Sequence, residues 1–350
     1  MIFIRFVVRT VFHIGIIESF LMFFVLINLL AFLLYFIDRR WAVKGKWWVS
    51  RVLLVLFALA CGGVGAFLAM CTDKNKAKST KLRLVVVVGM VIALIPMIHL
   101  AHAFTLDRIV RYVEVEFSSP NWPVELNGYR IAFITDPHVI SDETIAKVAA
   151  ELNERNLDLL LLGGDFSMWD GHYQGTIREL AQVATTDGIF GVEGNHDNHE
   201  WLFSAMAQHG MTPLDNSGVH IRDAFFLAGV HDKLNRNPNV AEAIAGAYLD
   251  DFVLLVSHNP DVTMRQSTTG VDLVLSGHTH SGQITFFGFS MYLLRGSITN
   301  YGTRFSRGFA YSADGIPVYT STGIGIYYEI PRVFARPEVV IFTMYNEEKG

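Results

Sequence analysis

Two histidines stand two residues apart in the stretch VLSGHTHSGQ, where His278 and His280 follow an apolar run that ends in a glycine. On an extended segment, side chains at positions i and i+2 point to the same side. Both imidazoles would then be crowded into one place, which folding alone does not require. The spacing therefore indicates that the two rings bind something together.

Residues of similar chemistry follow four other apolar runs of the chain. They are Asp136 and His138 after YRIAFIT, Asp165 after LDLLLLG, Asn195, His196 and Asp197 after GIFGV, and His258 after DFVLLVS. A single Asp or His at such a place is usually a cap or a turn former. Independent turn preferences do not explain five such endings, four of which bring a histidine.

Mixed carboxylate, amide and imidazole ligands suit divalent metals such as Mn, Fe and Zn. The chain offers too many of them for one ion, but two ions about 3.5–4 Å apart that share a carboxylate would accommodate the set. A water that bridges two such ions loses a proton near neutral pH and becomes a nucleophile. The residue types therefore predict a two-metal site for phosphoryl transfer.

The apolar runs read as buried strands, at residues 129–135, 157–163, 188–192, 224–230, 251–257 and 271–277. Three stretches between them, SDETIAKVAAELNER, GTIRELAQVA and WLFSAMAQHG, are typical of amphipathic helices, and Ser141 suits the N-cap of the first. The alternation predicts an α/β layered domain over residues 128–350. In such folds, ligand sites lie beyond the carboxyl ends of the strands.

Residues 1–106 differ from the rest of the 350-residue chain in charge and hydropathy. They carry 12 Lys and Arg against 3 acids, whereas residues 107–350 carry 16 and 30. Three apolar segments, at about 11–37, 49–70 and 84–104, are each long enough to cross a bilayer, which takes about 20 residues. We therefore predict a transmembrane domain of about three helices over residues 1–106, a juxtamembrane linker over 107–127, and a multi-pass protein of the cell membrane.

Neither charge nor cysteine decides on which side of the membrane the catalytic domain lies. Basic residues are equally numerous on the two sides of the three spans. Cys61 and Cys71 both lie at the second span and provide no disulfide framework. The negative balance of residues 107–350 argues against a nucleic acid as a partner, because phosphate neutralisation dominates such binding.

The order of the polar motifs resembles that of the calcineurin-like metallophosphoesterases. The motifs are Asp136-Pro137-His138, Gly164-Asp165, Gly194-Asn195-His196-Asp197, Ser257-His258 and Gly277-His278-Thr279-His280. Each is weak alone, but the joint set is specific, and the resemblance covers roughly residues 128–343. The tail PVYTSTGIGIYYEIPRVFARPEV is similar to that of the bacterial membrane-tethered branch. The resemblance implies a double β-sheet sandwich flanked by helices.

The resemblance also implies roles for the motif residues. One metal would be bound by Asp136, His138 and His280, and the second by Asn195, His258 and His278, with Asp165 bridging them. His196, held by Asp197, would stabilise the transition state or protonate the leaving oxygen. Two divalent ions are implied, for which we expect Mn, with Fe or Zn as alternatives. The family often has an acid three residues after the Gly-Asp motif, whereas the next acid here is Asp170, which is no metal ligand.

Membrane attachment favours a lipid-linked phosphate as the substrate. An apolar segment follows the GHTH motif, with Phe286, Phe287, Phe289, Met291, Tyr292, Leu293 and Leu294 ahead of Arg295, Arg304 and Arg307. It would accommodate acyl chains and bind phosphate, or it is simply a strand pair of the second sheet. The tethered branch resembles enzymes that cleave the pyrophosphate of UDP-diacylglucosamine. We expect a membrane-anchored phosphodiesterase or pyrophosphatase that uses a metal-bridging hydroxide at the lipid interface.

Two alternatives stay open. The spans could merely anchor a metallophosphatase for soluble or cell-wall phosphodiesters. Residues 35–83 loosely resemble a small bacterial two-helix membrane domain of unknown role, which could make the chain a membrane assembly or partner-binding protein. Five further histidines match no ligand position of the family: His172, His199, His209, His220 and His231. Two of these, His172 and His199, are candidates for loops near the substrate.

Overall fold

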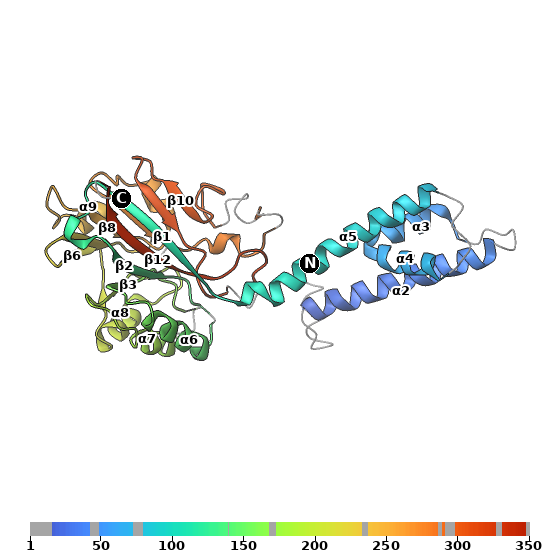
Figure 1. Cartoon of the computed structure of the whole chain (residues 1–350), viewed down its shortest axis with the longest axis horizontal. Helices are drawn as coiled ribbons and strands as arrows, with labels where there is room; N and C mark the ends of the chain where they lie inside the picture. The colour runs from blue at the N-terminus through green and yellow to red at the C-terminus, as the bar shows by residue number, and fades with distance from the viewer. Residues whose placement is uncertain are drawn as a thin grey trace. The chain divides into compact units, whose positions relative to one another are not determined.

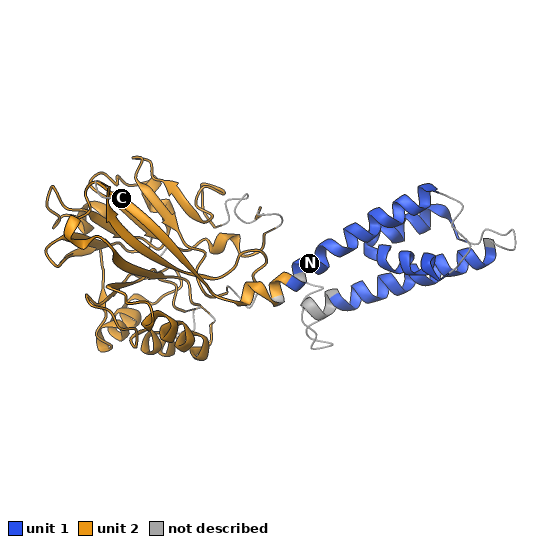
Figure 2. Cartoon of the chain, viewed as in Figure 1, with its two compact units in different colours: residues 1–101 blue, residues 102–350 orange. Residues whose placement is uncertain are grey.

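The computed structural model describes residues 16–42, 49–72, 80–138, 140–167, 173–232, 237–285, 289–290, 298–326 and 331–347. The chain divides into two compact units, Met1–Ala101 and His102–Gly350, which we call the N-terminal and C-terminal units (Figure 2). All the predicted metal ligands lie in the C-terminal unit.

The described part of the N-terminal unit is helical (Figure 1). Its elements are α2 (Ile16–Ala42), α3 (Arg51–Phe57), the irregular turn η1 (Ala58–Gly62), α4 (Gly63–Cys71) and α5 (Thr80–Phe104). Three segments are long and apolar enough to cross a membrane: Leu21–Trp41, Arg51–Cys71 and Thr80–Arg108. They overlap the three predicted spans, of which residues 11–15 lie outside the described residues. Helix α2 runs past the predicted end at residue 37 because charged side chains end an apolar run without ending a helix.

The second apolar segment is not one regular helix. Ala60 (ψ 40°) and Cys61 (φ 67°) leave the helical conformation within η1. Asn28 of α2 bridges this break, since its Nδ2 donates to the carbonyl of Cys61 (2.9 Å) and its Oδ1 accepts from the backbone N–H of Gly65 (2.8 Å). An amide side chain thus satisfies backbone groups at a helix break, which hydrocarbon could not do.

The strands of the C-terminal unit form two six-stranded sheets within the described residues. The first has the order β1 (Arg111–Ser119), β12 (Glu338–Asn346), β2 (Tyr129–Ile134), β3 (Leu159–Leu162), β4 (Ile189–Gly191) and β5 (Thr212–Pro213). The second has the order β10 (Gly308–Tyr311), β11 (Pro317–Thr320), β9 (Leu273–Ser276), β8 (Val253–Val256), β7 (Phe225–Gly229) and β6 (Ser217–Ile221). All six predicted strands are present, as β2, β3, β4, β7, β8 and β9.

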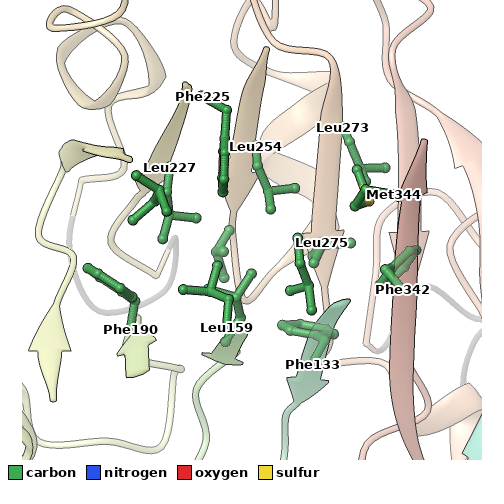
Figure 3. Close-up of a cluster of buried hydrophobic side chains, with 14 of the residues drawn as sticks. Phe133, Leu159, Phe190, Phe225, Leu227, Leu254, Leu273, Leu275, Phe342 and Met344 are labelled. Atoms are coloured by element: carbon green, nitrogen blue, oxygen red, sulfur yellow. The ribbon is translucent and has the colours of Figure 1, made fainter. Parts of the chain in front are cut away.

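The two sheets face each other across an apolar core (Figure 3). The first sheet supplies Phe133, Leu159 and Phe342, and the second supplies Leu254 and Leu275, all with no exposed surface. Burial of such side chains, at roughly 25 cal/mol per Å² of apolar surface, holds the sheets together.

Helices cover the outer faces of the sandwich. On the first sheet they are α6 (Asp142–Asn153), α7 (Gln174–Leu180) and α8 (His199–Gln208), which pack Ile145, Ile177 and Leu202 against the strands (Figure 1). The short α9 (Val240–Ala243) packs on the second sheet. The loops contain the single turns η2 (Leu106–Arg108), η3 (Val124–Leu126), η4 (Pro260–Met264) and η5 (His280–Gly282). The predicted α/β double-sheet sandwich flanked by helices, preceded by apolar helices, is confirmed.

The predicted linker over residues 107–127 is wrong in its central part. Strand β1 lies there and pairs in parallel with β12, with Arg111 opposite Glu338 and Ser119 opposite Asn346. The Arg111 guanidinium also contacts the Glu338 carboxylate at 2.6 Å. The alternating VEVEF pattern is therefore that of a half-buried edge strand, which belongs to the sheet rather than to a spacer.

Candidate metal centre

The sheet order explains why distant motifs meet. Strands β2, β3 and β4 are parallel neighbours in the first sheet, and β8 and β9 are parallel neighbours in the second. Their carboxyl ends deliver the polar motifs, with Asp136, His138, Asp165 and Asn195 from the first sheet and His258, His278 and His280 from the second. The candidate site therefore lies where the carboxyl ends of these strands of the two sheets meet.

The backbone is strained where these side chains leave the strands. Five of the predicted ligands have positive φ: Asp136 (54°), His138 (39°), Asp165 (59°), His278 (68°) and His280 (49°). Each such residue costs about 1–3 kcal/mol, and strain of this kind concentrates at functional sites. The motif glycines serve close packing, because a Cβ at Gly194 would collide with the Asp165 carboxylate and one at Gly277 with that of Asp136.

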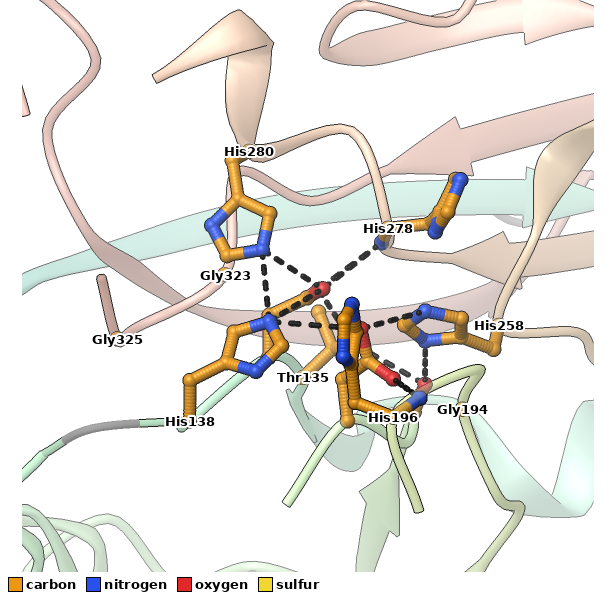
Figure 4. Close-up of polar contacts among 12 residues, drawn as sticks. Thr135, His138, Gly194, His196, His258, His278, His280, Gly323 and Gly325 are labelled. Atoms are coloured by element: carbon orange, nitrogen blue, oxygen red, sulfur yellow. Dashed lines mark hydrogen bonds and ion pairs between the residues drawn. The ribbon is translucent and has the colours of Figure 1, made fainter. Parts of the chain in front are cut away.

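One cluster consists of Asp136, His138 and His280, all buried (Figure 4). The Nε2 atom of His280 lies 3.2 Å from Oδ1 of Asp136 and 3.0 Å from Nε2 of His138. The Nδ1–H of His138 donates to the carbonyl oxygen of Ser167 (3.0 Å). That hydrogen bond turns the Nε2 lone pair of His138 toward the cluster.

A second cluster consists of Asp165, His258 and His278. The Nδ1–H of His258 donates to the carbonyl of Gly163 (2.7 Å), so its Nε2 atom faces Oδ2 of Asp165 at 3.2 Å. His278 donates from Nε2 to the carbonyl of Ile298 (3.0 Å), which leaves its Nδ1 available as a ligand. Ring nitrogens held by backbone carbonyls are typical of metal-binding histidines.

Asp165 lies between the two clusters. Its Oδ2 is 3.2 Å from Nε2 of His258 and 3.4 Å from Nε2 of His138. Both histidines use Nδ1 as the donor to a backbone carbonyl, so both Nε2 atoms point at one carboxylate oxygen. That contact is repulsive unless positive charge lies between the atoms. The residues present therefore fit two cations that share Asp165.

The electrostatics of the site point the same way. Burial opposes ionisation of Asp136 and Asp165, yet His280 beside Asp136 and His258 beside Asp165 hold the pKa of each carboxyl well below its usual range. Burial lowers the pKa of His138 to about 4. His258 moves in the opposite direction, because Asp165 overcomes the burial and raises the pKa of His258 well above its usual value. The raised pKa keeps a proton on Nε2 of His258, which a metal ion would displace when it binds this nitrogen and the ionised Asp165.

His196 and Asp197 lie beside the clusters, and the contacts of Asp197 are with the backbone. The two carboxylate oxygens of Asp197 accept the backbone N–H groups of Asp165, Phe166, Ser167 and Gly194, at 2.8–3.2 Å. Asp197 therefore holds the loop after β3, and its hold on His196 stays a prediction. His196 donates its own backbone N–H to Oδ1 of Asp165 (2.8 Å), and its ring centroid lies 5.3 Å from that of His138.

Two buried charged residues near the ligands were missed in the sequence. Arg332 places Nη2 at 3.2 Å from Nδ1 of His280 and donates from Nε to the carbonyl of Gly325 (2.7 Å). Asp232 is fully buried, and its charge favours the protonated form of both His258 and His278, although burial still leaves the pKa of His278 below its usual value. His231 and Asp232 follow the predicted strand AFFLAGV, so the strand-end pattern could have found Asp232, whereas no motif or spacing in the sequence indicates Arg332.

The structure places the remaining histidines and parts of the apolar segment after the GHTH motif in different surroundings. His209 caps the end of α8, and His220 contacts the Asp251 carboxylate at 2.8 Å. His199 and His231 lie together with Glu193. His172, Asp170, Phe286, Phe287, Met291, Tyr292, Leu293, Leu294 and Arg295 lie outside the described residues. Of the rest of that segment, Phe289 is two-thirds exposed, and Arg304 donates to the carbonyl of Tyr311.

Comparison with known proteins finds two families along the chain. Residues 129–282 match the family described as calcineurin-like phosphoesterase, and residues 28–81 match a family described as a protein of unknown function (DUF1294). The first match contains all the predicted metal ligands, both those that follow strands of the first sheet and those that follow strands of the second. The second overlaps the stretch that resembled a small bacterial membrane domain.

Relatives span bacteria and vertebrates. A Helicobacter pylori protein named uncharacterized metallophosphoesterase is 28% identical over 61% of this chain and 58% of its own length. A zebrafish (Danio rerio) transmembrane protein with metallophosphoesterase domain is 26% identical over 82% of this chain and 69% of its own length. A Campylobacter jejuni uncharacterized metallophosphoesterase is 25% identical over 90% of this chain and 84% of its own length. The chain thus spans less than two thirds of the Helicobacter relative.

Proposed function

Because the chain belongs to the calcineurin-like phosphoesterases, we propose that it is a membrane-anchored, two-metal phosphoesterase. It hydrolyses a phosphodiester or pyrophosphate bond, and its substrate is linked to a lipid. The observation that carries the proposal is the position of Asp165, whose Oδ2 faces the ring nitrogens of both His138 and His258. A carboxylate placed in this way is suited to bridge two ions.

Seven residues would hold the ions: Asp136, His138 and His280 for one, Asn195, His258 and His278 for the other, and Asp165 for both. When bound, two divalent cations would lower the pKa of a coordinated water and neutralise charge on the phosphoryl oxygens. Mn²⁺ is our choice for both positions, because oxygen and imidazole donors occur together and no thiolate lies among them. The protein's own task is to hold these donors rigidly, as the strained strand ends and the backbone-anchored imidazoles do.

His196 is the group that we assign to the substrate. Its backbone is fixed by the hydrogen bond to Asp165, and its ring lies beside that of His138 at the cluster. Burial lowers the pKa of His196, so the imidazole is neutral at neutral pH and carries one N–H. That N–H can donate a hydrogen bond to a phosphoryl oxygen or to the leaving oxygen. Asp197 supports it indirectly, through the loop that carries Asp165.

Two features favour a lipid-linked substrate. The N-terminal unit contains three segments able to cross a membrane, which would make the protein multi-pass and keep the active site near lipid. Apolar side chains are also exposed just after the metal ligands, since Ile284 is 38% and Phe289 66% exposed. Exposed apolar surface next to a polar site suits acyl chains that remain partly in the bilayer.

The test uses the full-length protein in lipid nanodiscs with added Mn²⁺. A lipid-linked pyrophosphate and a soluble aryl phosphodiester are compared as substrates, and phosphorus NMR identifies the products. Asp165→Ala serves as the inactive variant. Asp314→Asn, at an exposed loop carboxylate that accepts from Thr268, serves as the matched control.

Each outcome has a definite reading. Faster turnover of the lipid-linked pyrophosphate, lost in Asp165→Ala and kept in Asp314→Asn, supports the proposal. Preference for the soluble ester would contradict the lipid-linked part and reduce the spans to an anchor. No turnover of either substrate by metal-loaded protein would overturn the enzymatic assignment and favour a partner-binding role for the segment that matches the family of unknown function.

A further inference from the structure

A separate group of histidines and carboxylates lies outside the metal centre. It consists of Glu193 after β4, His199 at the start of α8, Asp215 between β5 and β6, and His231 after β7. None of these residues has a role in the proposed hydrolysis. Glu193 is buried, with 1% of its surface exposed, whereas the side chain of Asp215 is 46% exposed. The group therefore extends from the interior to the solvent.

Each imidazole of this group lies between the same two carboxylates. Glu193 faces the Nδ1 atoms, with Oε2 at 3.0 Å from His199 and Oε1 at 3.2 Å from His231. Asp215 faces the Nε2 atoms, with Oδ1 at 2.6 Å from His231 and Oδ2 at 3.6 Å from His199. The two ring centroids are 5.4 Å apart. Both ring nitrogens of both histidines thus meet an anionic oxygen.

The number of protons on the two imidazoles limits how many of these four contacts can be hydrogen bonds. A neutral imidazole has one N–H, so it can donate to only one of its two carboxylates and presents a lone pair to the other. Four favourable contacts therefore require two protons more than the neutral rings carry, or a cation in place of the two protons on one side. One divalent cation at the two Nδ1 atoms balances the charge of the two carboxylates, while each ring stays neutral and keeps its proton on Nε2.

We propose that Glu193, His199 and His231 bind a third divalent cation, for which Zn²⁺ is the best match. The ligands are the two Nδ1 atoms and the Glu193 carboxylate, all within 4.8 Å of one another. Two His and one Glu form a known zinc ligand set, and tetrahedral ligands about 2.1 Å from zinc lie about 3.4 Å apart, close to the contacts seen. Asp215 then accepts the Nε2–H of His231 and faces that of His199 at 3.6 Å, which makes it the outer carboxylate that zinc-bound histidines usually have.

The third cation would help to position residues of the metal centre, because its ligands are neighbours in the chain of Asn195 and Asp232. Glu193 lies two residues before Asn195, and His231 directly precedes the buried Asp232, whose charge acts on His258 and His278. A cation shared by Glu193 and His231 would tie the loop after β4 to the loop after β7, and hence the first sheet to the second. We assign it a positioning role, because none of its ligands lies in the two clusters of the metal centre.

The test counts metal ions in the full-length protein. Protein purified in detergent is loaded with Zn²⁺, desalted and measured by inductively coupled plasma mass spectrometry. Wild type should hold three ions per chain, and His231→Gln and Glu193→Gln should each hold two. His220→Gln is the matched control, because His220 also contacts a carboxylate but lies outside the group, and it should keep three. His231→Cys should keep three as well, since a thiolate replaces the imidazole as a zinc ligand.

The outcomes separate this site from the metal centre. Asp165→Ala should lose ions of the metal centre and keep the third, so failure of the two-metal proposal would leave this one testable. Two ions in wild type, or no loss of an ion in His231→Gln, would overturn the third site. Loss in His231→Cys equal to that in His231→Gln would also overturn it, because that result indicates a histidine needed for packing or protonation rather than for zinc.

Discussion

The two units bury opposite kinds of side chain. In the N-terminal unit the fully buried positions include many small residues, namely Ala31, Ala58, Ala66, Ala69 and Ala93, while Val25, Val52 and Leu84 are each more than 60% exposed. In the C-terminal unit the core between the sheets is built from Phe, Leu, Ile and Val (Figure 3). The N-terminal unit thus turns its large apolar side chains outward, as helices surrounded by lipid do.

The difference follows from the solvent. Water expels large apolar side chains, so the C-terminal unit gains most of its stability by burying them. Lipid is as apolar as leucine, so helices within it associate through close backbone contact, which small residues allow. Gly63 and Gly65 show this contact, because a Cβ at Gly63 would collide with the backbone of Gly89 and one at Gly65 with that of Asn28.

Polar residues are also used differently in the two units. The buried Asp and His of the C-terminal unit converge on one end of the sheets, where backbone strain and mutual charge make them costly for folding. In the N-terminal unit, Asn28 satisfies backbone groups at the break around Cys61. Polar groups thus serve chemistry in one unit and helix packing in the other, and substitutions can test that contrast.

The largest effect is expected from Asp165→Ala. Removal of the residue between the two clusters should lower hydrolysis by more than the roughly 10–100-fold typical of outer partners of a metal site. The thermal unfolding temperature of the C-terminal unit should fall only modestly, because His258 and the backbone N–H of His196 lose a partner while the positive φ stays strained for Ala. Hydrolysis and unfolding of the metal-free protein are measured on one preparation. Retained hydrolysis with a collapsed unfolding temperature would assign Asp165 to the fold instead.

Matched leucines compare the two cores directly. Leu254→Ala, at a position without exposed surface in the C-terminal core, should cost about 2–5 kcal/mol of unfolding free energy through lost burial and a cavity. Leu54→Ala, at 1% exposure in the N-terminal unit, should cost clearly less, because its unfolded reference is lipid. Urea unfolding reports on the first and SDS titration in mixed micelles on the second. Equal costs would contradict the distinction between the units.

The sequence predicted the parts of this fold that depend on local pattern. The strand ends that carry Asp and His could be predicted because each apolar run and the polar residues that end it are adjacent in the sequence. Strand β1 was missed because its partner β12 lies 227 residues away, and nothing local distinguishes an edge strand from an alternating linker. The break at Cys61 was missed for a similar reason, since the group that stabilises it, Asn28, lies on another helix.

The site was predictable to a similar degree. Motif order brought out the residues of the two clusters, but the contacts of Asp197 are with backbone N–H groups, which no residue pattern encodes. The group of Glu193, His199, Asp215 and His231 comes from three segments, namely the connection from β4 into α8, the loop between β5 and β6, and the loop after β7, and the sheet order brings these together. Tertiary structure, rather than residue type, was the missing information.

A methyl group added at Gly65 should have the next largest effect. Gly65→Ala places a Cβ against the backbone oxygen of Asn28, so α2 and α4 must separate or shift. Overpacking of this kind costs about 1–3 kcal/mol, although Ala is the better helix former. SDS titration measures it, with Leu68→Ala, at a half-exposed position of α4, as the control. Stabilisation of Gly65→Ala would show that the helices do not depend on close contact.

The smallest effect concerns one amide in each unit. Asn28 and Asn153 both bridge two backbone groups, since Asn153 donates to the carbonyl of Gln182 (3.1 Å) and accepts from the N–H of Ala184 (2.7 Å) at an exposed position. Water can replace the amide in Asn153→Leu, so that change should stay within about 0.5 kcal/mol. Hydrocarbon cannot do so in Asn28→Leu, for which we expect a loss of about 0.6–2 kcal/mol. The unfolding free energy of each unit, from SDS titration for Asn28 and urea for Asn153, gives the comparison. A loss in Asn153→Leu as large as that in Asn28→Leu would mean that the two amides act through their geometry alone, and that the surrounding solvent does not set the energy of a polar bridge in this protein.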